Sequence, residues 1–123
     1  MASLIVTSGD QTGEFLPLGR RTSVIGRAEN LPLQILDNLV SRKHLRICFD
    51  DATHKYNAED MSSKHGVFVN GHKITEPAPL TDGDEILIGN VTLLFTDENI
   101  SDRESALSHY KKVGERNRTT IGE

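Results

Sequence analysis

The chain has 123 residues, a formal net charge of −4 and one cysteine. The length fits one domain with some chain to spare, and the negative charge argues against a broad nucleic-acid-binding surface. The single cysteine, Cys48, excludes an internal disulfide, and no apolar run approaches the length of a membrane span. The first residues lack the basic region of a signal peptide. We therefore expect a soluble, cytoplasmic monomer that binds neither nucleic acid nor membranes.

Short apolar runs bounded by turn residues recur through residues 1–100, the pattern of an antiparallel β sandwich. The expected strands are residues 3–7, 15–18, 22–26, 33–36, 45–49, 54–60, 67–69, 72–75, 84–88 and 91–95. Pro77 and Pro79 predict a loop between the eighth and ninth of these strands. About ten to eleven short strands are enough for two packed sheets.

Two dipeptides predict tight hairpins between neighbouring strands. Asn70-Gly71 follows the strand at 67–69, and Gly89-Asn90 separates the last two strands. Asparagine and glycine tolerate the positive φ angles that two-residue hairpin turns require. These residues are therefore explained by the backbone of the turn.

The composition changes after residue 100, which divides the chain into a domain at 1–100 and a short helix with a flexible tail or linker at 101–123. Residues 101–104 form a capping-box pattern and Gly114 is a stop signal, so we expect one helix over about residues 102–112. Thr119 and Thr120 follow basic residues and are a candidate phosphorylation site. The simpler alternative is that this segment links the domain to further domains.

Cations and a hydroxyl gather in three polar segments next to predicted strands. Arg27 ends one strand, Ser41-Arg42 precedes the strand at 45–49, and Lys64 lies before the strand at 67–69. Such groups on loop ends suit an anion of the size of phosphate. The five histidines do not have the spacing of zinc ligands and are not accompanied by cysteine ligands, so we expect no metal and no cofactor.

In order and spacing, these segments resemble the forkhead-associated (FHA) family, over about residues 3–98. Gly26-Arg27 ends a strand, Ser41 and His44 fit the family's S-x-x-H motif, and residues 60–71 fit a segment that ends in Asn-Gly. The resemblance implies a β sandwich whose loops at one end bind phosphothreonine peptides. It also implies a non-catalytic adaptor or regulator in signalling by an upstream Ser/Thr kinase.

The resemblance assigns roles to the predicted site residues. Arg27 contacts the phosphate, which an arginine can grip through two parallel N–H bonds. Ser41 donates its hydroxyl to another phosphate oxygen, and Arg42 holds the phosphate or the peptide backbone. His44 braces the Ser41 loop, while Gly26 and the Asn70-Gly71 turn support the site.

An enzymatic role for Ser41 and His44, as nucleophile and base, is rejected. Residues three apart in a strand or loop point to different sides, and no acidic residue stands where it could orient His44.

The third segment departs from the family. Many relatives read S-T-N-G-T where this chain has Ser63-Lys64-His65-Gly66-Val67. Lys64 can replace the threonine as a point-charge contact, and His65 can donate one hydrogen bond but cannot reproduce an amide. The alternative is therefore a degenerate pocket in a domain that binds a protein partner without phosphate, through a sheet face or strand edge. A phosphopeptide pull-down with and without phosphatase treatment distinguishes the two hypotheses. A further hypothesis, suggested by Thr119 and Thr120, is that the domain's own C-terminal tail regulates it by folding back into the pocket.

Overall fold

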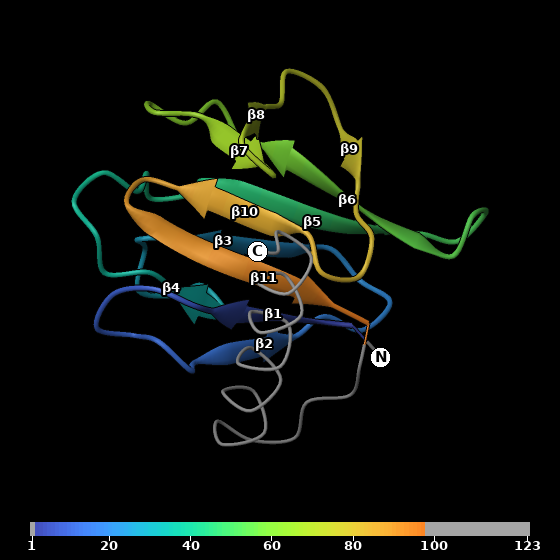
Figure 1. The fold of residues 1–123 in the computed structure, drawn as a ribbon, viewed down its shortest axis with the longest axis horizontal. Coiled ribbons are helices and arrows are strands. Elements are labelled where there is room, and N and C mark those ends of the chain that lie inside the picture. Colours follow the sequence, from blue (N-terminus) through green and yellow to red (C-terminus); the bar gives the residue numbers. More distant parts are fainter. Residues whose placement is uncertain (1, 98–123) are drawn as a thin grey trace, which may run out of the picture.

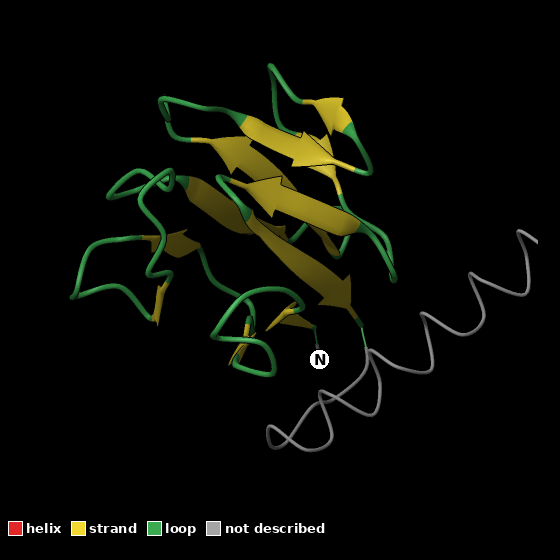
Figure 2. Ribbon diagram, turned by 60° about the vertical axis from the view of Figure 1, so that its left-hand side comes forward, coloured by secondary structure: helices red, strands yellow, loops and turns green. Residues whose placement is uncertain are grey.

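The computed structural model describes residues 2–97, which form strands, turns and loops in two packed layers (Figures 1 and 2). The all-β sandwich expected from the sequence is confirmed. No helix in this part of the chain is long and apolar enough to cross a membrane. The helix expected at 102–112 and the segment with Thr119 and Thr120 lie outside the described residues.

Two sheets make up the sandwich, and neighbouring strands in each are hydrogen-bonded. The six-stranded sheet has the order β2 (Phe15–Pro17), β1 (Ser3–Val6), β11 (Val91–Thr96), β10 (Glu85–Ile88), β7 (Val67–Val69) and β8 (His72–Lys73). The five-stranded sheet has the order β4 (Leu33–Gln34), β3 (Ser23–Gly26), β5 (Leu45–Asp50), β6 (Lys55–Asp60) and β9 (Ala78–Pro79). Figure 1 shows the strands of both sheets, labelled in chain order.

The ten expected strands are all present, with ends that differ by a few residues, but the sequence missed β9. The loop predicted from Pro77 and Pro79 is wrong at this point, because Ala78 and Pro79 pair with β6. Proline has no N–H to donate, but β9 is an edge strand, where that donor is not needed. A second difference is that β3 and β4 pair in parallel, whereas the other described pairs are antiparallel.

The core lies between the two sheets and is built from alternate residues of the long strands. In β5, Leu45 and Ile47 are fully buried, as their alternation predicts. They join the inward side chains of the facing sheet, which include Ile86, Leu93 and Phe95. Burial of this apolar surface is the main stabilising contribution, and it fixes the frame that carries the loops.

Tyr56 stabilises the end of the sandwich at which β3 begins, opposite the end at which β3 finishes with Gly26. Its hydroxyl donates a hydrogen bond to the Gly19 carbonyl oxygen at 2.6 Å, and its ring meets Phe49 and Phe95 with centroids 5.1 and 5.6 Å away. Burial, followed by the nearby Asp97 carboxylate, raises the pKa of Tyr56. Burial and the carboxylate therefore favour the protonated phenol, the form that can donate this hydrogen bond.

Tyr56→Phe should lower the free energy of unfolding by about 1 kcal/mol at neutral pH, because a buried carbonyl loses its donor. A raised pKa means that this stabilisation is present below the ordinary tyrosine pKa of about 10 and is lost as the pH rises through the raised value. Urea unfolding from pH 7 to 11 should therefore show the two proteins converging. The exposed substitution Thr53→Ala is the control, and a difference that grew with pH would contradict this account.

Candidate functional site

Three loops meet at one end of the sandwich. Because β3 ends, β5 begins, β6 ends and β7 begins at this end, it gathers residues 27–32, 35–44 and 61–66. Every predicted contact residue of the sequence analysis falls in these loops. Sheet topology alone thus brings together segments that are far apart in the chain.

The first loop is joined to the second through the backbone. The Arg27 N–H donates to the Ser41 carbonyl oxygen at 3.0 Å, and the Ala28 N–H donates to the Arg42 carbonyl oxygen at 3.1 Å. A Cβ on Gly26 would lie 2.3 Å from the Arg42 carbonyl oxygen. Glycine at 26 is therefore required by the close approach of the two backbones.

His44 connects the second loop to the third from a fully buried position. Its Nδ1 accepts the Ser41 backbone N–H at 3.0 Å, and its Nε2 lies 2.7 Å from the Gly66 carbonyl oxygen. Since Nδ1 accepts, Nε2 must carry the hydrogen and donate it. Both ring nitrogens are occupied by backbone groups, so neither is placed to take a proton from the Ser41 hydroxyl.

Ser41 and the third loop are also in direct contact. The Lys64 backbone N–H donates to the Ser41 Oγ at 3.1 Å, which leaves the hydroxyl hydrogen able to donate to a ligand. The third loop holds its own shape, because Asp60 accepts the Ser63 N–H at 3.0 Å and Ser63 Oγ accepts the Gly66 N–H at 2.9 Å. The Lys64 side chain is exposed above this fixed backbone.

Arg27 is oriented by a contact on one side of its guanidinium group. Its Nε donates to the Val40 carbonyl oxygen at 2.9 Å, and the terminal nitrogens are left for other acceptors. Arg46, by contrast, is engaged by Glu59 across the β5–β6 pair, and this hydrogen bond raises the pKa of Arg46. The Arg46–Glu59 contact is the only ion pair within residues 2–97.

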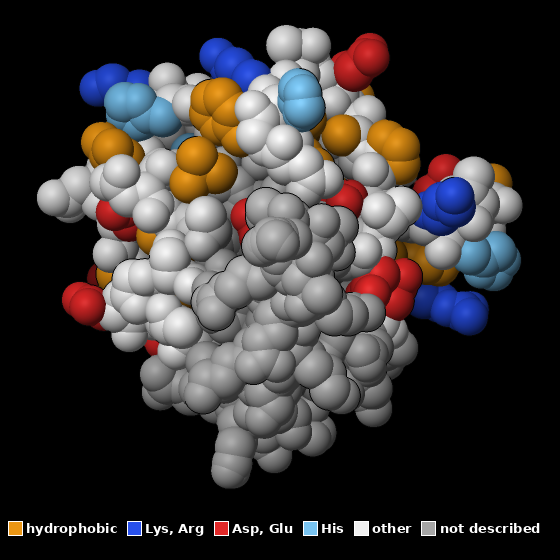
Figure 3. Space-filling view, in the orientation of Figure 1, with side chains coloured by type: hydrophobic (Ala, Val, Ile, Leu, Met, Phe, Trp, Pro, Cys, Tyr) orange, Lys and Arg blue, Asp and Glu red, His pale blue; other side chains and the backbone are white. Residues whose placement is uncertain are grey.

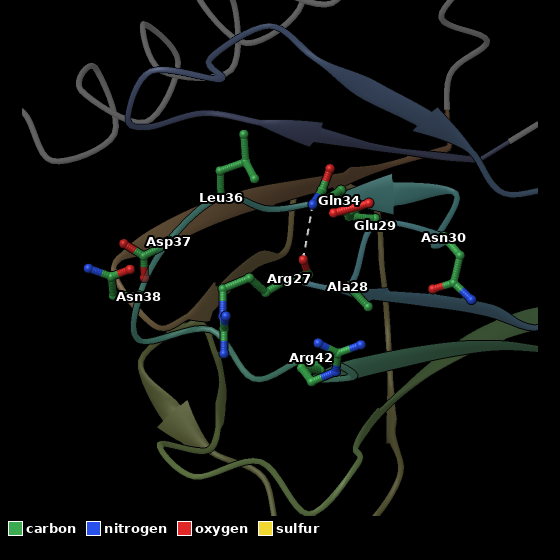
Figure 4. Close-up of a pocket in the computed structure, with 9 residues that line it drawn as sticks. All are labelled: Arg27, Ala28, Glu29, Asn30, Gln34, Leu36, Asp37, Asn38 and Arg42. Atoms are coloured by element: carbon green, nitrogen blue, oxygen red, sulfur yellow. Dashed lines mark hydrogen bonds between the residues drawn. The ribbon is translucent and has the colours of Figure 1, made fainter.

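A hollow of about 710 Å³ opens beside the two arginines of the site. It is lined by Arg27, Ala28, Glu29, Asn30, Gln34, Leu36, Asp37, Asn38 and Arg42. Figure 4 shows the arginine side chains on one side of this hollow and Leu36 with Gln34 on the other. Ser41, Lys64 and His65 do not line it, so the predicted residues meet at the loop end without sharing a single cavity.

Two polar side chains that sequence reasoning missed hold the second loop in place. Gln11 accepts the Leu36 N–H at 2.7 Å through Oε1, and Asp37 Oδ2 accepts the Asn90 N–H at 3.1 Å. Their partners are 25 and 53 residues away, so no local pattern could reveal them. One result is that Leu36 is held 70% exposed beside the arginines.

Asn70 and Gly71 have φ angles of 51° and 85°, as the hairpin prediction requires. Asn70 also ties the turn to the neighbouring strand, since its Oδ1 accepts the Glu85 N–H at 2.9 Å. Val67, where relatives have a threonine, is fully buried in the core, which gives this departure a packing reason. Within residues 2–97, no three His, Cys, Asp or Glu side chains are grouped so that they could hold a metal ion.

The structure is thus a β sandwich whose end loops are joined by hydrogen bonds and carry arginines and a serine hydroxyl. The FHA domain model matches residues 23–89, more than half of the chain, and the chain belongs to the FHA family.

Three similar proteins illustrate the family. The chain is 36% identical to the ABC transporter ATP-binding/permease protein Rv1747 of Mycobacterium tuberculosis, over 84% of this chain and 11% of the transporter. It is 30% identical to the glycogen accumulation regulator GarA of Mycolicibacterium smegmatis, over 76% of this chain and 58% of GarA. A structure from a study of phosphothreonine-dependent FHA domain interactions superposes with a TM-score of 0.70 at 25% identity, covering 80% of this chain and 98% of that one. The chain thus spans only part of these two relatives.

Gly26→Ala should destabilise the protein by about 1–3 kcal/mol, because the new methyl group overlaps the Arg42 carbonyl and the second loop must move. Denaturant unfolding measures the loss. Gly9→Ala shows the cost of backbone strain without a clash, since Gly9 has a φ of +81° and nothing within 4 Å of an added Cβ. If Gly26→Ala were as stable as the wild type, the backbone contact at Gly26 would not constrain the loops.

His44→Leu should cost about 2–4 kcal/mol, because the Ser41 N–H and the Gly66 carbonyl both lose a buried partner. Amide hydrogen exchange should then show faster exchange at both residues 41–44 and 61–66. His72→Leu, at an exposed position on β8, is the control. Faster exchange in only one of the two loops would contradict the coupling.

Proposed function

We propose that this FHA domain is a non-catalytic module that binds phosphothreonine peptides and acts as an adaptor or regulator in Ser/Thr kinase signalling. The observation that carries the proposal is the hydrogen bond from Arg27 Nε to the Val40 carbonyl oxygen, which orients the guanidinium group. The Ser41 hydroxyl lies on the same loop as Val40, and hydrogen bonds join this loop to the other two. The structural neighbour from a study of phosphothreonine-dependent interactions and the regulator GarA support it at the level of the family.

The chemistry of capture follows from these groups. A phosphothreonine carries close to two negative charges and three strong acceptor oxygens. The terminal nitrogens of Arg27 can donate two parallel bonds to it, and the Ser41 hydroxyl can donate a third. Arg42, which follows Ser41 in the chain, and Lys64, whose backbone N–H contacts the Ser41 Oγ, add positive charge from exposed positions. Because hydrogen bonds already fix the loop backbones, binding requires little further ordering of them.

A second candidate function is binding of a protein partner without phosphate. The observation in its favour is the pair of exposed apolar side chains in the second loop, Leu36 at 70% and Leu39 at 39% exposed. The replacement of the family's Thr-Asn by Lys64-His65 also favours it. A cytoplasmic location and a monomeric state stay predictions, as does phosphorylation of Thr119 and Thr120.

Calorimetric titration with a degenerate phosphothreonine peptide library should give binding that the unphosphorylated library does not show. Arg27→Ala should abolish it, and Arg27→Lys should weaken it tenfold or more, because lysine keeps the charge but loses the parallel bonds and the Val40 contact. The phosphoserine library, titrated in parallel, measures how much the binding depends on threonine.

The matched control is Arg21→Ala, which removes an exposed arginine from the β2–β3 turn at the remote end of the sandwich. Equal loss in Arg21→Ala and Arg27→Ala would mean that general charge attracts the peptides. Binding that is indifferent to phosphate would favour the second candidate function, and substitution of Leu36 by Asp should then abolish it.

A further inference from the structure

The charges around the proposed site are unequal on its two sides. On the β3–β4 side, Glu29 and Asp37 line the same hollow as Arg27 and Arg42. A second negative charge on a ligand would meet these carboxylates there. The other side of the site, formed by the β6–β7 loop and β8, has a different composition.

Four exposed side chains on that other side are cationic or can become so. They are Lys64, His65, His72 and Lys73. In Figure 3, Lys or Arg and His side chains lie along the edge of the molecule over β7 and β8. We call this group the β6–β8 corner.

Lys73 joins this corner through packing and not through sequence proximity. The position of a Cβ on Gly66 would lie 2.8 Å from Lys73 Cε and 3.6 Å from its Nζ. The aliphatic part of the Lys73 side chain therefore packs against Gly66 in the third loop. Gly66 directly follows His65 and is two residues after Lys64 in the chain. Gly66, with a φ of +84°, leaves the space that this side chain occupies.

Glu76, three residues after Lys73, is the nearest carboxylate to it in the chain and is exposed, whereas two other carboxylates near the corner accept hydrogen bonds. Asp60 accepts the Ser63 N–H, and Asp84 accepts hydrogen bonds from Asn70 and Thr81. The one ion pair within residues 2–97 is on β5 and β6, so no carboxylate of this part of the chain lies at ion-pair distance from Lys64 or Lys73. An anion bound at this corner would be attracted by both lysine charges.

We propose that the β6–β8 corner binds a second anionic group, a carboxylate or another phosphate, on the same peptide that carries the phosphothreonine. Lys73 and Lys64 provide the charge, and Glu29 and Asp37 keep the anion from the opposite side of the site. This inference rests on the proposed function and names the class of peptide that the domain selects: phosphothreonine with an acidic neighbour.

The test uses a peptide with one phosphothreonine among alanines, in which each neighbouring position is changed in turn to aspartate, and in a second series to phosphoserine. Wild type and Lys73→Gln are titrated with both series. At one or more positions on one side of the phosphothreonine, aspartate should raise the affinity of the wild type about two- to fivefold, the effect of an exposed ion pair. Lys73→Gln should remove that gain and leave the affinity for the all-alanine peptide nearly unchanged.

Lys55→Gln is the matched control, since Lys55 is exposed at the start of β6, at the remote end of the sandwich. A gain in the phosphoserine series alone would identify the second group as phosphate and not carboxylate. The inference is overturned if no position gives a gain, or if Lys73→Gln and Lys55→Gln reduce the gain equally. In either case, binding of the all-alanine phosphothreonine peptide would leave the proposed function standing, whereas its absence would overturn both.

Discussion

The constraint on which this site depends is the buried imidazole of His44. It takes a hydrogen bond from Ser41 on one loop and gives one to Gly66 on another. Because a side chain in the core accepts and donates at fixed distances, the two loops cannot move independently. The contact from the Lys64 N–H to the Ser41 Oγ depends on that alignment. A histidine that could be mistaken for a general base is thus bonded to backbone at both ring nitrogens.

Electrostatics adds a second level of selection to this frame. The chain carries a net charge of −4, and the described part has one ion pair, which lies on the strands and not at the loops. The loop cations Arg27, Arg42 and Lys64 therefore have no carboxylate of residues 2–97 at ion-pair distance. An approaching anionic peptide meets overall repulsion that is screened beyond about 8 Å at physiological salt, and attraction only near the loops. Such a distribution favours a ligand whose negative charge is concentrated.

Sequence reasoning reached the fold because alternation along a strand is a local signal. The residues of β5 alternate between core and surface, so their burial follows from the sequence alone. β9 was missed because Pro77 and Pro79 suppress the strand signal, and only its place at a sheet edge makes the pairing acceptable. The motif residues are close together because the sheet topology places the ends of β3 and β6 and the starts of β5 and β7 at the same end of the sandwich. The support from Gln11 and the packing of Lys73 on Gly66 depend on tertiary proximity, which no local pattern encodes.

The departures in the third loop fit into this frame one at a time. Val67 is in the core, so its side chain is selected by packing and cannot reach a ligand. Lys64 contributes its backbone N–H to Ser41, a role that any residue except proline could fill, and its side chain is therefore free to differ from the family's threonine. A threonine or asparagine in this loop offers directed hydrogen bonds, whereas Lys64 and Lys73 offer charge with little directional preference. In the proposed function, the arginine side of the site sets the geometry of the phosphate, and the β6–β8 corner selects by charge what lies next to it.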